Sequence, residues 1–343
     1  MAEFARHVGL ARTTVSRVLN RQPGLKASTI ERVQRALTET GFTPNAYATF
    51  LRGRGTASVG ICLENVLTPT IVLKLATLQQ QLRGLGYSSL IEVYAPGESR
   101  TIVRHFLSMR VGAVVFIGHF DAAEVGERVR ELIAHKTPHL VIDHHGIPHA
   151  NTVTLDRAEA MRRVMAHLLD GGHRSFGLLG IPFEAPSRYE RIHGIRAALA
   201  ERGLDPAACT RSFDAHCPRL QDFEFGRALI LRFLELKQPP TAYVALNDEI
   251  AIGAMRALQD AGINIPRDTS VTGFNNQDIG SMVSPGLTTV DQQIEPTIRT
   301  ATQVLLSHLR RGVPERLVLR TIEPQLILRG STGPAPAAVS SPP

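Results

Sequence analysis

Cysteines and long apolar segments are scarce in this chain of 343 residues. The cysteines are odd in number and have no CxxC spacing, which predicts reduced thiols: Cys62, Cys209 and Cys217. No run of about 18 apolar residues is present, so no membrane span is expected. The first residues also lack the apolar segment of a secretory signal. We therefore expect a cytoplasmic protein.

The sequence also lacks the motifs that mark common enzymes. It contains no P-loop, no HExxH, no GxSxG and no GxGxxG after its first predicted strand. Nothing marks Asp156 and Glu190 as an acid/base pair, because they lie far apart in the sequence. A histidine-rich segment around Asp143 has no standard zinc spacing and is expected to be an exposed loop: His139, His144, His145 and His149. These absences predict a protein that is not an enzyme and holds no metal or cofactor.

Positive charge is concentrated at the start of the chain. Residues 1–55 contain nine lysines and arginines and three acidic residues, a net charge of +6, whereas the whole chain carries +7. A generally basic protein would spread this charge over its length. A small basic segment before a nearly neutral body is typical of nucleic-acid binding.

The same segment has the pattern of two short helices separated by a turn, over residues 2–8 and 12–20. In the second helix Val15, Val18 and Leu19 share one face, at spacings of three and four residues. The opposite face is polar: Arg12, Thr13, Ser16, Arg17 and Asn20. Such a face suits the DNA major groove, where arginine can bond to guanine through two hydrogen bonds. An ordinary amphipathic surface helix is the alternative.

A third helix is predicted over residues 29–40. Ser28 and Glu31 have the spacing of a capping box, and Gly41 ends the helix. The following residues, 45–55, contain too little apolar surface to fold by themselves, and a flexible linker is the simplest interpretation.

From Ser58 onward predicted strands alternate with predicted helices. The strands are 58–63, 88–94, 112–118, 139–143, 175–180, 241–247 and 270–274. The helices are 71–85, 101–109, 122–135, 157–169, 188–202, 225–236 and 250–261. This alternation predicts parallel sheets covered on both faces, in two series and therefore two lobes. Ligands of such sheets bind beyond the carboxyl ends of the strands, so we expect a binding cleft between the lobes.

Polar residues stand directly after several of these strands, where a ligand in that cleft would lie: Glu64, Asn65, Asp143, Asn247, Asp248, Asn275 and Asn276. Arg191 stands at the start of a predicted helix. Arginine and amide side chains suit a polyhydroxylated ligand, because they donate to and accept from hydroxyl groups. For each residue alone, a turn-forming role at a strand end is the alternative.

Several segments occur in an order that resembles the LacI/GalR family of bacterial transcription regulators: TTVSRVLN, TPNAYATFLRGR, VALNDEIAIGAMRAL, SVTGFNN and SPGLTTVDQ. FNNQDIG is also similar to the gluconate-responsive members. The resemblance extends to about residue 330. It implies a small all-α helix-turn-helix domain followed by a two-lobed α/β core of the type I periplasmic-binding-protein-like fold, with parallel sheets.

The resemblance also implies boundaries and crossings. The domains are 1–44 for DNA binding, 45–56 for a hinge, and 57–329 for effector binding and dimerisation. Residues 330–343 are rich in glycine, proline, alanine and serine, and this composition predicts a disordered tail. Lobe 1 would comprise 57–156 and 290–320, and lobe 2 would comprise 157–289 and 321–329. The chain would cross between lobes near residues 156, 289 and 321.

Site residues follow from the same resemblance. The implied DNA contacts are Arg12, Thr13, Ser16, Arg17, Asn20, Asn45, Leu51, Arg52 and Arg54. The hinge would fold on DNA, with Leu51 as a wedge in the minor groove. The implied effector contacts are Glu64, Asn65, Asp143, Arg191, Asn247 and Asn275. This chain departs from the family at three positions: Ala11 replaces a usual serine, Lys26 replaces a polar N-cap, and Asn275 replaces a usual aspartate.

The implied function is that of a homodimeric repressor on double-stranded, near-palindromic operator DNA. Its effector would be a small sugar or sugar acid, and the amide of Asn275 favours the acid because it removes a negative charge. A regulator of the same fold controlled by a partner protein is one alternative. A transport-type solute-binding protein is the other, but it would need a signal peptide and would lack the basic first 55 residues.

Overall fold

The structure is a computed structural model of the chain. It describes residues 2–19, 22–42, 58–64, 68–95, 97–118, 120–144, 146–181, 186–213, 222–312 and 316–337. Several predicted site residues lie outside this description: Asn20, Asn45, Leu51, Arg52, Arg54, Asn65 and the side chain of Glu64. The chain divides into two compact units, Met1–Ala57 and Ser58–Pro343. Within the described residues, every helix is too short or too polar to cross a bilayer.

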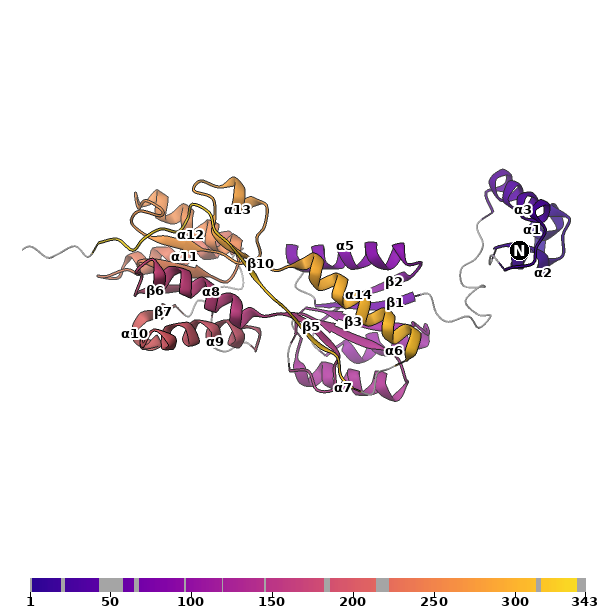
Figure 1. The fold of residues 1–343 in the computed structure, drawn as a ribbon, viewed down its shortest axis with the longest axis horizontal. Coiled ribbons are helices and arrows are strands. Elements are labelled where there is room, and N and C mark those ends of the chain that lie inside the picture. The colour runs from indigo at the N-terminus through magenta and orange to yellow at the C-terminus, as the bar shows by residue number, and fades with distance from the viewer. Residues whose placement is uncertain are drawn as a thin grey trace, which may run out of the picture. The chain divides into compact units, whose positions relative to one another are not determined.

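The first unit is a bundle of short helices around a small apolar core (Figure 1). Its helices are α1 (Ala2–Val8), α2 (Arg12–Leu19) and α3 (Ala27–Thr40). Val15 of α2 and Val33 of α3 are fully buried, and the rings of Phe4 and Phe42 stack with centroids 4.3 Å apart. The apolar face predicted for the second helix is therefore the face that packs into this core.

Helix α3 begins earlier than its sequence pattern suggested. Lys26 is its N-cap and makes no side-chain capping bond, so Ser28 lies inside the first turn. The predicted capping box of Ser28 and Glu31 is therefore wrong, because a serine caps only from the residue before the helix. Gly41 ends the helix in the left-handed conformation, with a φ of 61°.

Helix α2 begins without a capping side chain. The amide of Val15 donates to the Ala11 carbonyl at 3.1 Å, so Ala11 is the N-cap, and its methyl group cannot accept a hydrogen bond. We expect Ala11→Ser to stabilise α2 by about 0.5–2 kcal/mol, because a serine hydroxyl accepts from the second or third helical amide. Amide hydrogen exchange of the full chain should slow at Thr13 and Thr14 and stay unchanged in α3. Unchanged exchange at both threonines would contradict this capping role.

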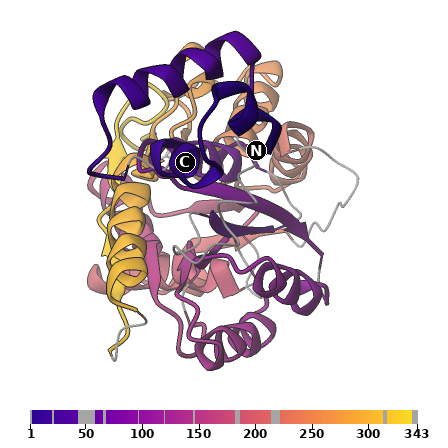
Figure 2. The same ribbon diagram turned by 90° about the vertical axis from the view of Figure 1, so that its right-hand side faces the viewer.

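The first lobe of the second unit is built on a parallel sheet with the order β11-β5-β4-β3-β1-β2 in the described residues. Its strands are β1 (Ser58–Glu64), β2 (Ser88–Tyr94), β3 (Ala113–Ile117), β4 (His139–Ile142), β5 (Thr152–Leu155) and β11 (Leu319–Ile322). Helices α5 (Pro69–Gly84) and α14 (Ile294–Arg311) pack on one face. Helices α6 (Ser99–Ser108) and α7 (Ala122–Ala134) pack on the other (Figure 2).

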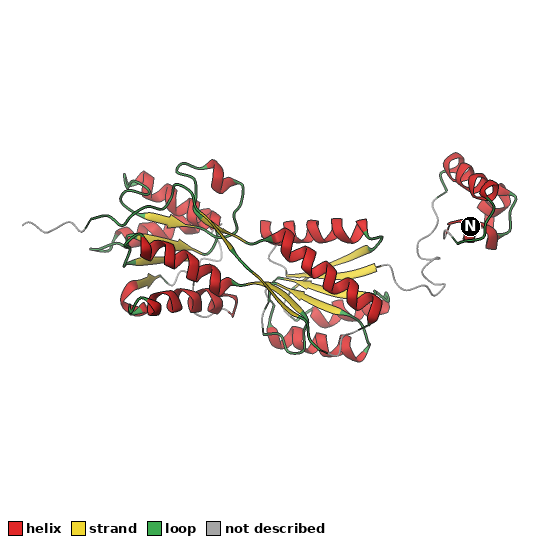
Figure 3. Cartoon of the chain, viewed as in Figure 1, coloured by secondary structure: helices red, strands yellow, loops and turns green. Residues whose placement is uncertain are grey.

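The second lobe has the same layered design around a parallel sheet, with the order β7-β6-β8-β9 in the part described (Figure 3). Its strands are β6 (Phe176–Leu179), β7 (Thr210–Ser212), β8 (Ala242–Ala245) and β9 (Ser270–Thr272). Its helices are α8 (Arg157–Asp170), α9 (Pro186–Glu201), α10 (Pro206–Cys209), α11 (Asp222–Leu234), α12 (Asp248–Asp260) and α13 (Ile279–Met282). Helices α8 and α9 pack on one face of the sheet, and α11 and α12 pack on the other.

Three connections join the lobes in the described part of the chain (Figure 1). One follows β5, one follows β10 (Thr289–Asp291), and one lies between β11 and β12 (Gln325–Ile327). Strands β10 and β12 pair antiparallel beside the second lobe. The sequence pattern missed these strands, together with β5, β7, α10, α13 and α14. Strands β5, β7 and β10 are rich in polar residues, unlike the apolar β4, β6 and β8 that were predicted, and β12 is defined by its distant partner β10. Helix α14 has a helical pattern of buried residues and could have been predicted.

The predicted disordered tail, residues 330–343, is wrong for residues 330–337. Ser331 is fully buried: its hydroxyl donates to the Val271 carbonyl at 2.6 Å and accepts from the Thr288 amide at 2.8 Å. The Ala335 amide donates to the Gly171 carbonyl at 2.8 Å. Composition misled the prediction, because this segment is held by hydrogen bonds of backbone and hydroxyl groups rather than by apolar side chains. Residues 338–343 lie outside the described residues.

Candidate DNA-binding helix and effector site

Helix α2 presents the polar face that the sequence predicted for DNA contact. Arg12, Thr13 and Arg17 are exposed and Ser16 is half-buried, whereas the valines on the opposite face are buried. Arg17 Nη2 donates to the Pro23 carbonyl at 3.2 Å, so this side chain is held over the loop that follows the helix. The unit thus presents a helix with a donor-rich outer face.

The candidate effector residues belong to different elements of the second unit. Asp143 follows β4, Asn247 follows β8, Asn275 follows β9, and Arg191 lies on α9. Strands β4 and β3, and likewise β8 and β9, are parallel, so their carboxyl ends lie on one side of each sheet. The strand-end placement expected from the sequence is therefore present for these residues.

Asp143 lies in a buried cluster of charges. Its carboxylate accepts from the ammonium of Lys74 and, at 3.1 Å, from Arg157 Nη2. Arg157 Nη1 also lies 3.8 Å from the Glu190 carboxylate. The cluster joins the first lobe to α8 and α9 of the second.

Lys74 is the residue of this cluster that sequence reasoning missed. It lies on the inner stripe of α5 with Ile71, Leu78 and Leu82, and its side chain is 1% exposed. Burial lowers the pKa of Lys74, and the neighbouring carboxylate of Asp143 acts in the opposite direction. The available signal was a lysine inside the apolar stripe of a helix, where a charge needs a buried partner.

Gln292, just after β10, connects this cluster to the second lobe. Its side-chain oxygen accepts from Lys74 Nζ at 2.6 Å, and its nitrogen donates to the side-chain oxygen of Asn275. Asn275 has a φ of 120°, which is unusual for a residue with a side chain. Its backbone NH group donates to the Val290 carbonyl at 2.9 Å. The connection between the lobes therefore fixes the Asn275 side chain.

Asn247 and Asn276 have local structural partners. Asn247 is the N-cap of α12: its oxygen accepts from the Ile250 amide at 2.8 Å, and its nitrogen donates to Asp222. The Asn276 nitrogen donates to Asp291 at 2.8 Å and its oxygen accepts from Arg329 at 2.7 Å. Both residues thus meet the turn and cap roles that were the alternatives to ligand contact.

Arg191 lies in the second turn of α9 rather than at its start, because the helix begins at Pro186. Its side chain is buried, and the guanidinium carbon lies 4.4 Å from the centre of the Phe274 ring. This cation–π contact places Arg191 beside the residue that precedes Asn275. Two of the predicted effector residues are thereby brought near each other from different elements.

The exposed loop predicted for the histidine-rich segment is wrong for His139 and His144, whereas His149 is exposed. His139 and His144 are buried, and His144 Nε2 lies 2.8 Å from the Phe120 carbonyl oxygen. Burial lowers the pKa of His139 to about 4. Over the described residues, no three histidine, cysteine, aspartate or glutamate side chains are grouped as metal ligands would be.

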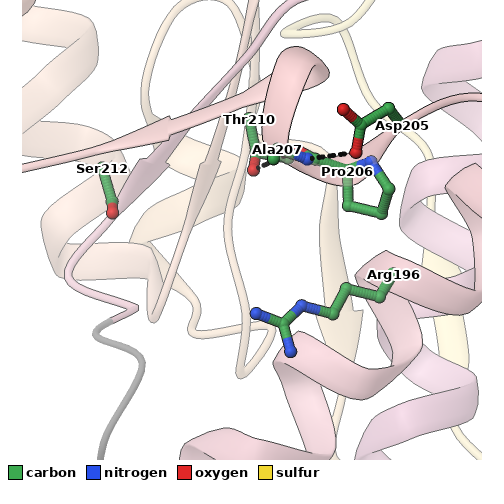
Figure 4. Close-up of a pocket in the computed structure, with 6 residues that line it drawn as sticks. All are labelled: Arg196, Asp205, Pro206, Ala207, Thr210 and Ser212. Atoms are coloured by element: carbon green, nitrogen blue, oxygen red, sulfur yellow. Dashed lines mark hydrogen bonds between the residues drawn. The ribbon is translucent and has the colours of Figure 1, made fainter.

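A cavity of about 470 Å³ lies elsewhere on the second lobe (Figure 4). Its lining comes from α9, α10 and β7: Arg196, Asp205, Pro206, Ala207, Thr210 and Ser212. The Asp205 carboxylate accepts from the Ala207 amide at 3.0 Å, and the Thr210 hydroxyl donates to the Pro206 carbonyl at 2.7 Å. These bonds hold α10 in place, and the cavity contains none of the predicted effector residues.

A basic helical unit with an exposed polar face on α2, followed by a two-lobed α/β core, is the architecture of a class of DNA-binding regulators. Residues 1–45 match the model of bacterial regulatory proteins of the lacI family, and residues 165–332 match the periplasmic binding protein-like domain. An uncharacterized HTH-type transcriptional regulator in the aml 5'region of Streptomyces limosus is 30% identical over 97% of this chain and 94% of its own length. The chain belongs to the lacI family of transcription regulators.

Other relatives agree with this assignment. The HTH-type transcriptional regulator MalR of Streptomyces coelicolor is 28% identical, over 98% of this chain and 97% of its own length. Among solved structures, the Lac repressor bound to ONPG in the repressed state has a TM-score of 0.83 at 23% identity, over 96% of this chain and 98% of that one. The helix-turn-helix domain and two-lobed periplasmic-binding-protein-like fold predicted from the sequence are confirmed.

Proposed function

We propose that this protein is a sequence-specific repressor that binds operator DNA through α2 and is controlled by a small carbohydrate-type effector. The observation that carries the DNA-binding part is the polar face of α2, with Arg12, Thr13 and Arg17 exposed over a buried core. In the proposed complex these side chains and Ser16 enter the major groove. Asn20 and the segment with Asn45, Leu51, Arg52 and Arg54 complete the contacts, with residues 45–56 as the hinge.

The effector part of the proposal rests on the residues beyond the strand ends. Asp143, Arg191 and Asn275 come from both lobes, and contacts through Gln292 and Phe274 bring them near one another. Glu64, Asn65 and Asn247 complete the proposed set. Sugars are bound by two solved proteins of this fold, a regulator CelR in complex with cellobiose and a LacI family regulator from Enterococcus faecium with ribose.

A homodimer is part of the proposed function, because two recognition helices would read the two halves of a near-palindromic operator. Large apolar side chains are exposed in both lobes and would be covered by a second copy: Val72, Leu73, Ile91 and Val93 in the first, and Phe223, Leu231, Ile279 and Met282 in the second. Binding of effector would change the lobe arrangement and hence operator affinity, with a coupling of about 1–3 kcal/mol. The proposed location is the cytoplasm.

Arg17→Ala tests the placement of the recognition helix. The operator is first selected from random DNA with the full chain. The substitution should weaken operator binding roughly tenfold to hundredfold and random-DNA binding much less, because a base contact is worth about 1–3 kcal/mol. Arg35→Ala is the matched control. It removes an exposed charge from α3 and should weaken binding to operator DNA and to random DNA by the same factor. Equal losses on both DNAs for Arg17→Ala would contradict the proposed placement.

A thermal-shift screen separates effector control from control by a partner protein. The full chain is tested against neutral sugars, sugar acids, sugar phosphates and nucleosides. A ligand at a hundredfold excess over its Kd stabilises the native state by about 2.7 kcal/mol, so a true effector raises the melting temperature. No shift with any class, in protein that still binds its operator, would favour a partner-protein regulator instead.

A further inference from the structure

A buried run of hydrogen bonds ends at the candidate effector residue Asn275. It begins at Lys74, whose ammonium donates to the side-chain oxygen of Gln292 at 2.6 Å. The Gln292 nitrogen then donates to the side-chain oxygen of Asn275. Lys74 is 1% exposed and Gln292 6%, so the first bond of this run is shielded from water. The run crosses from α5 of the first lobe to the end of β9 in the second.

The ammonium of Lys74 determines which side-chain atom, oxygen or nitrogen, Gln292 and Asn275 turn toward their neighbours. An amide side chain alone can turn either its oxygen or its nitrogen toward a neighbour, but an ammonium can only donate. Gln292 must therefore face Lys74 with its oxygen and Asn275 with its nitrogen. Asn275 must in turn face Gln292 with its oxygen, and its NH2 group is left without a hydrogen-bond partner among the described residues.

Several neighbouring acceptors of the described residues already take part in hydrogen bonds. The Asp143 carboxylate accepts from Lys74 and Arg157, and the Asp248 carboxylate accepts from the Thr289 hydroxyl and the Gln277 amide. The side-chain oxygen of Asn247 accepts from its own helix. The guanidinium of Arg191, beside Phe274, can only donate. Beside these carboxylates, the NH2 group of Asn275 and the guanidinium of Arg191 supply only donors.

We infer that the effector is an acidic carbohydrate whose carboxylate is bound by the NH2 group of Asn275, and that Lys74 is the positioning residue that sets this preference. This inference rests on the proposed effector function of the same site. A carboxylate has only acceptors and forms strong hydrogen bonds with such donors. A neutral sugar hydroxyl also needs an acceptor for its proton, which this arrangement does not supply at Asn275.

Calorimetric titration of the full chain with matched pairs tests the preference. The probes are D-gluconate and D-glucuronate against D-glucose, and D-galacturonate against D-galactose. We expect an acid to bind roughly tenfold or more tightly than its neutral partner, as loss of one charge-assisted bond implies. A neutral sugar that binds as tightly as its acid would overturn the inference and leave the carbohydrate effector standing. No binding by any probe would count against the carbohydrate effector itself, and the inference would fall with it.

Gln292→Glu tests the role of Lys74 through the direction of the run. A glutamate accepts from Lys74 and has only acceptors left, so Asn275 must turn its NH2 group toward it and display its oxygen instead. Acid affinity should fall roughly tenfold or more, while affinity for the neutral partner stays or rises. A purely structural role would lower both affinities together.

Gln292→Met is the matched neutral variant, because glutamate also adds a negative charge. Methionine leaves Asn275 able to display either atom, so the ratio of acid to sugar affinity should fall toward one. If charge repulsion alone explained the glutamate result, the methionine variant would keep the wild-type ratio, and the role of Lys74 would be refuted. Thermal unfolding of each variant shows that the second unit is still folded.

Discussion

Replacing Asp143 with asparagine is expected to lower the free energy of unfolding of the Ser58–Pro343 unit by about 3–5 kcal/mol. The Asp143 carboxylate is the acceptor shared by Lys74 and Arg157, and all three side chains are buried. Asparagine keeps the size of the side chain and tolerates the left-handed backbone at this position, where φ is 73°. The loss would therefore report a buried Lys74 left without its anion and an Arg157 left with only the more distant carboxylate of Glu190, 3.8 Å away.

Urea unfolding of the full chain measures this loss, with Asp170→Asn as the matched control. Asp170 pairs with Arg202 at the surface, where its side chain is 64% exposed, so its removal should change stability little. If the Asp143→Asn variant were as stable as the Asp170→Asn variant, the buried carboxylate would not be stabilising the cations of Lys74 and Arg157. The double variant Asp143→Leu/Lys74→Met should lose less free energy of unfolding than Asp143→Leu alone, because one buried cation is removed together with the anion.

Gly253→Ala is expected to destabilise the same unit by about 2–3 kcal/mol, although alanine is the better helix former. Helices α11 and α12 approach so closely that a Cβ on Gly253 would lie 1.9 Å from the Phe223 carbonyl oxygen. A Cβ on Gly226 would lie 2.0 Å from the Ile250 carbonyl oxygen, so the contact is reciprocal. These atoms belong to the backbone, and relief requires the two helices to move apart.

Gly84→Ala is the matched control for this substitution. Gly84 is the last residue of α5, and a Cβ there meets nothing within 4 Å. We expect no loss, or a gain of up to about 1 kcal/mol, from the lower entropy of the unfolded chain. Chemical denaturation measures the free energy of unfolding of both variants, and equal changes in the two would contradict the close-packing explanation. Because Asn247 caps α12, displacement of this helix should also weaken effector binding at that end.

Local pattern was sufficient for much of the fold. The helix 12–20 was predicted from Val15, Val18 and Leu19, and the structure has α2 over Arg12–Leu19 with this face packed inward. The strand predicted over residues 88–94 coincides with β2. Helix α2 could be predicted because burial of one face imposes a period on neighbouring residues, and β2 because it is a short apolar run with β-branched residues.

The candidate site could be predicted only in part from the local sequence pattern. Asp143, Asn247 and Asn275 were found because polar residues follow apolar strands. The pattern did not reveal that Asp143 is neutralised by Lys74 and Arg157, or that Asn247 caps a helix. The position of Lys74 in the apolar stripe of its helix indicates burial, but the partners that make this burial possible lie outside that helix.

The sequence by itself determined the basic recognition unit, the alternation of strands and helices, and the family to which the chain belongs, because each depends on neighbouring residues or on motifs in order. Tertiary structure alone decided the ordered segment 330–337, the burial of His139 and His144 and the run from Lys74 to Asn275. Lys74 and Gln292 are 218 positions apart, and Gln292 and Asn275 are 17 apart across a strand. No local period records such contacts, because hydrogen bonds between distant segments form only when folding brings their elements together.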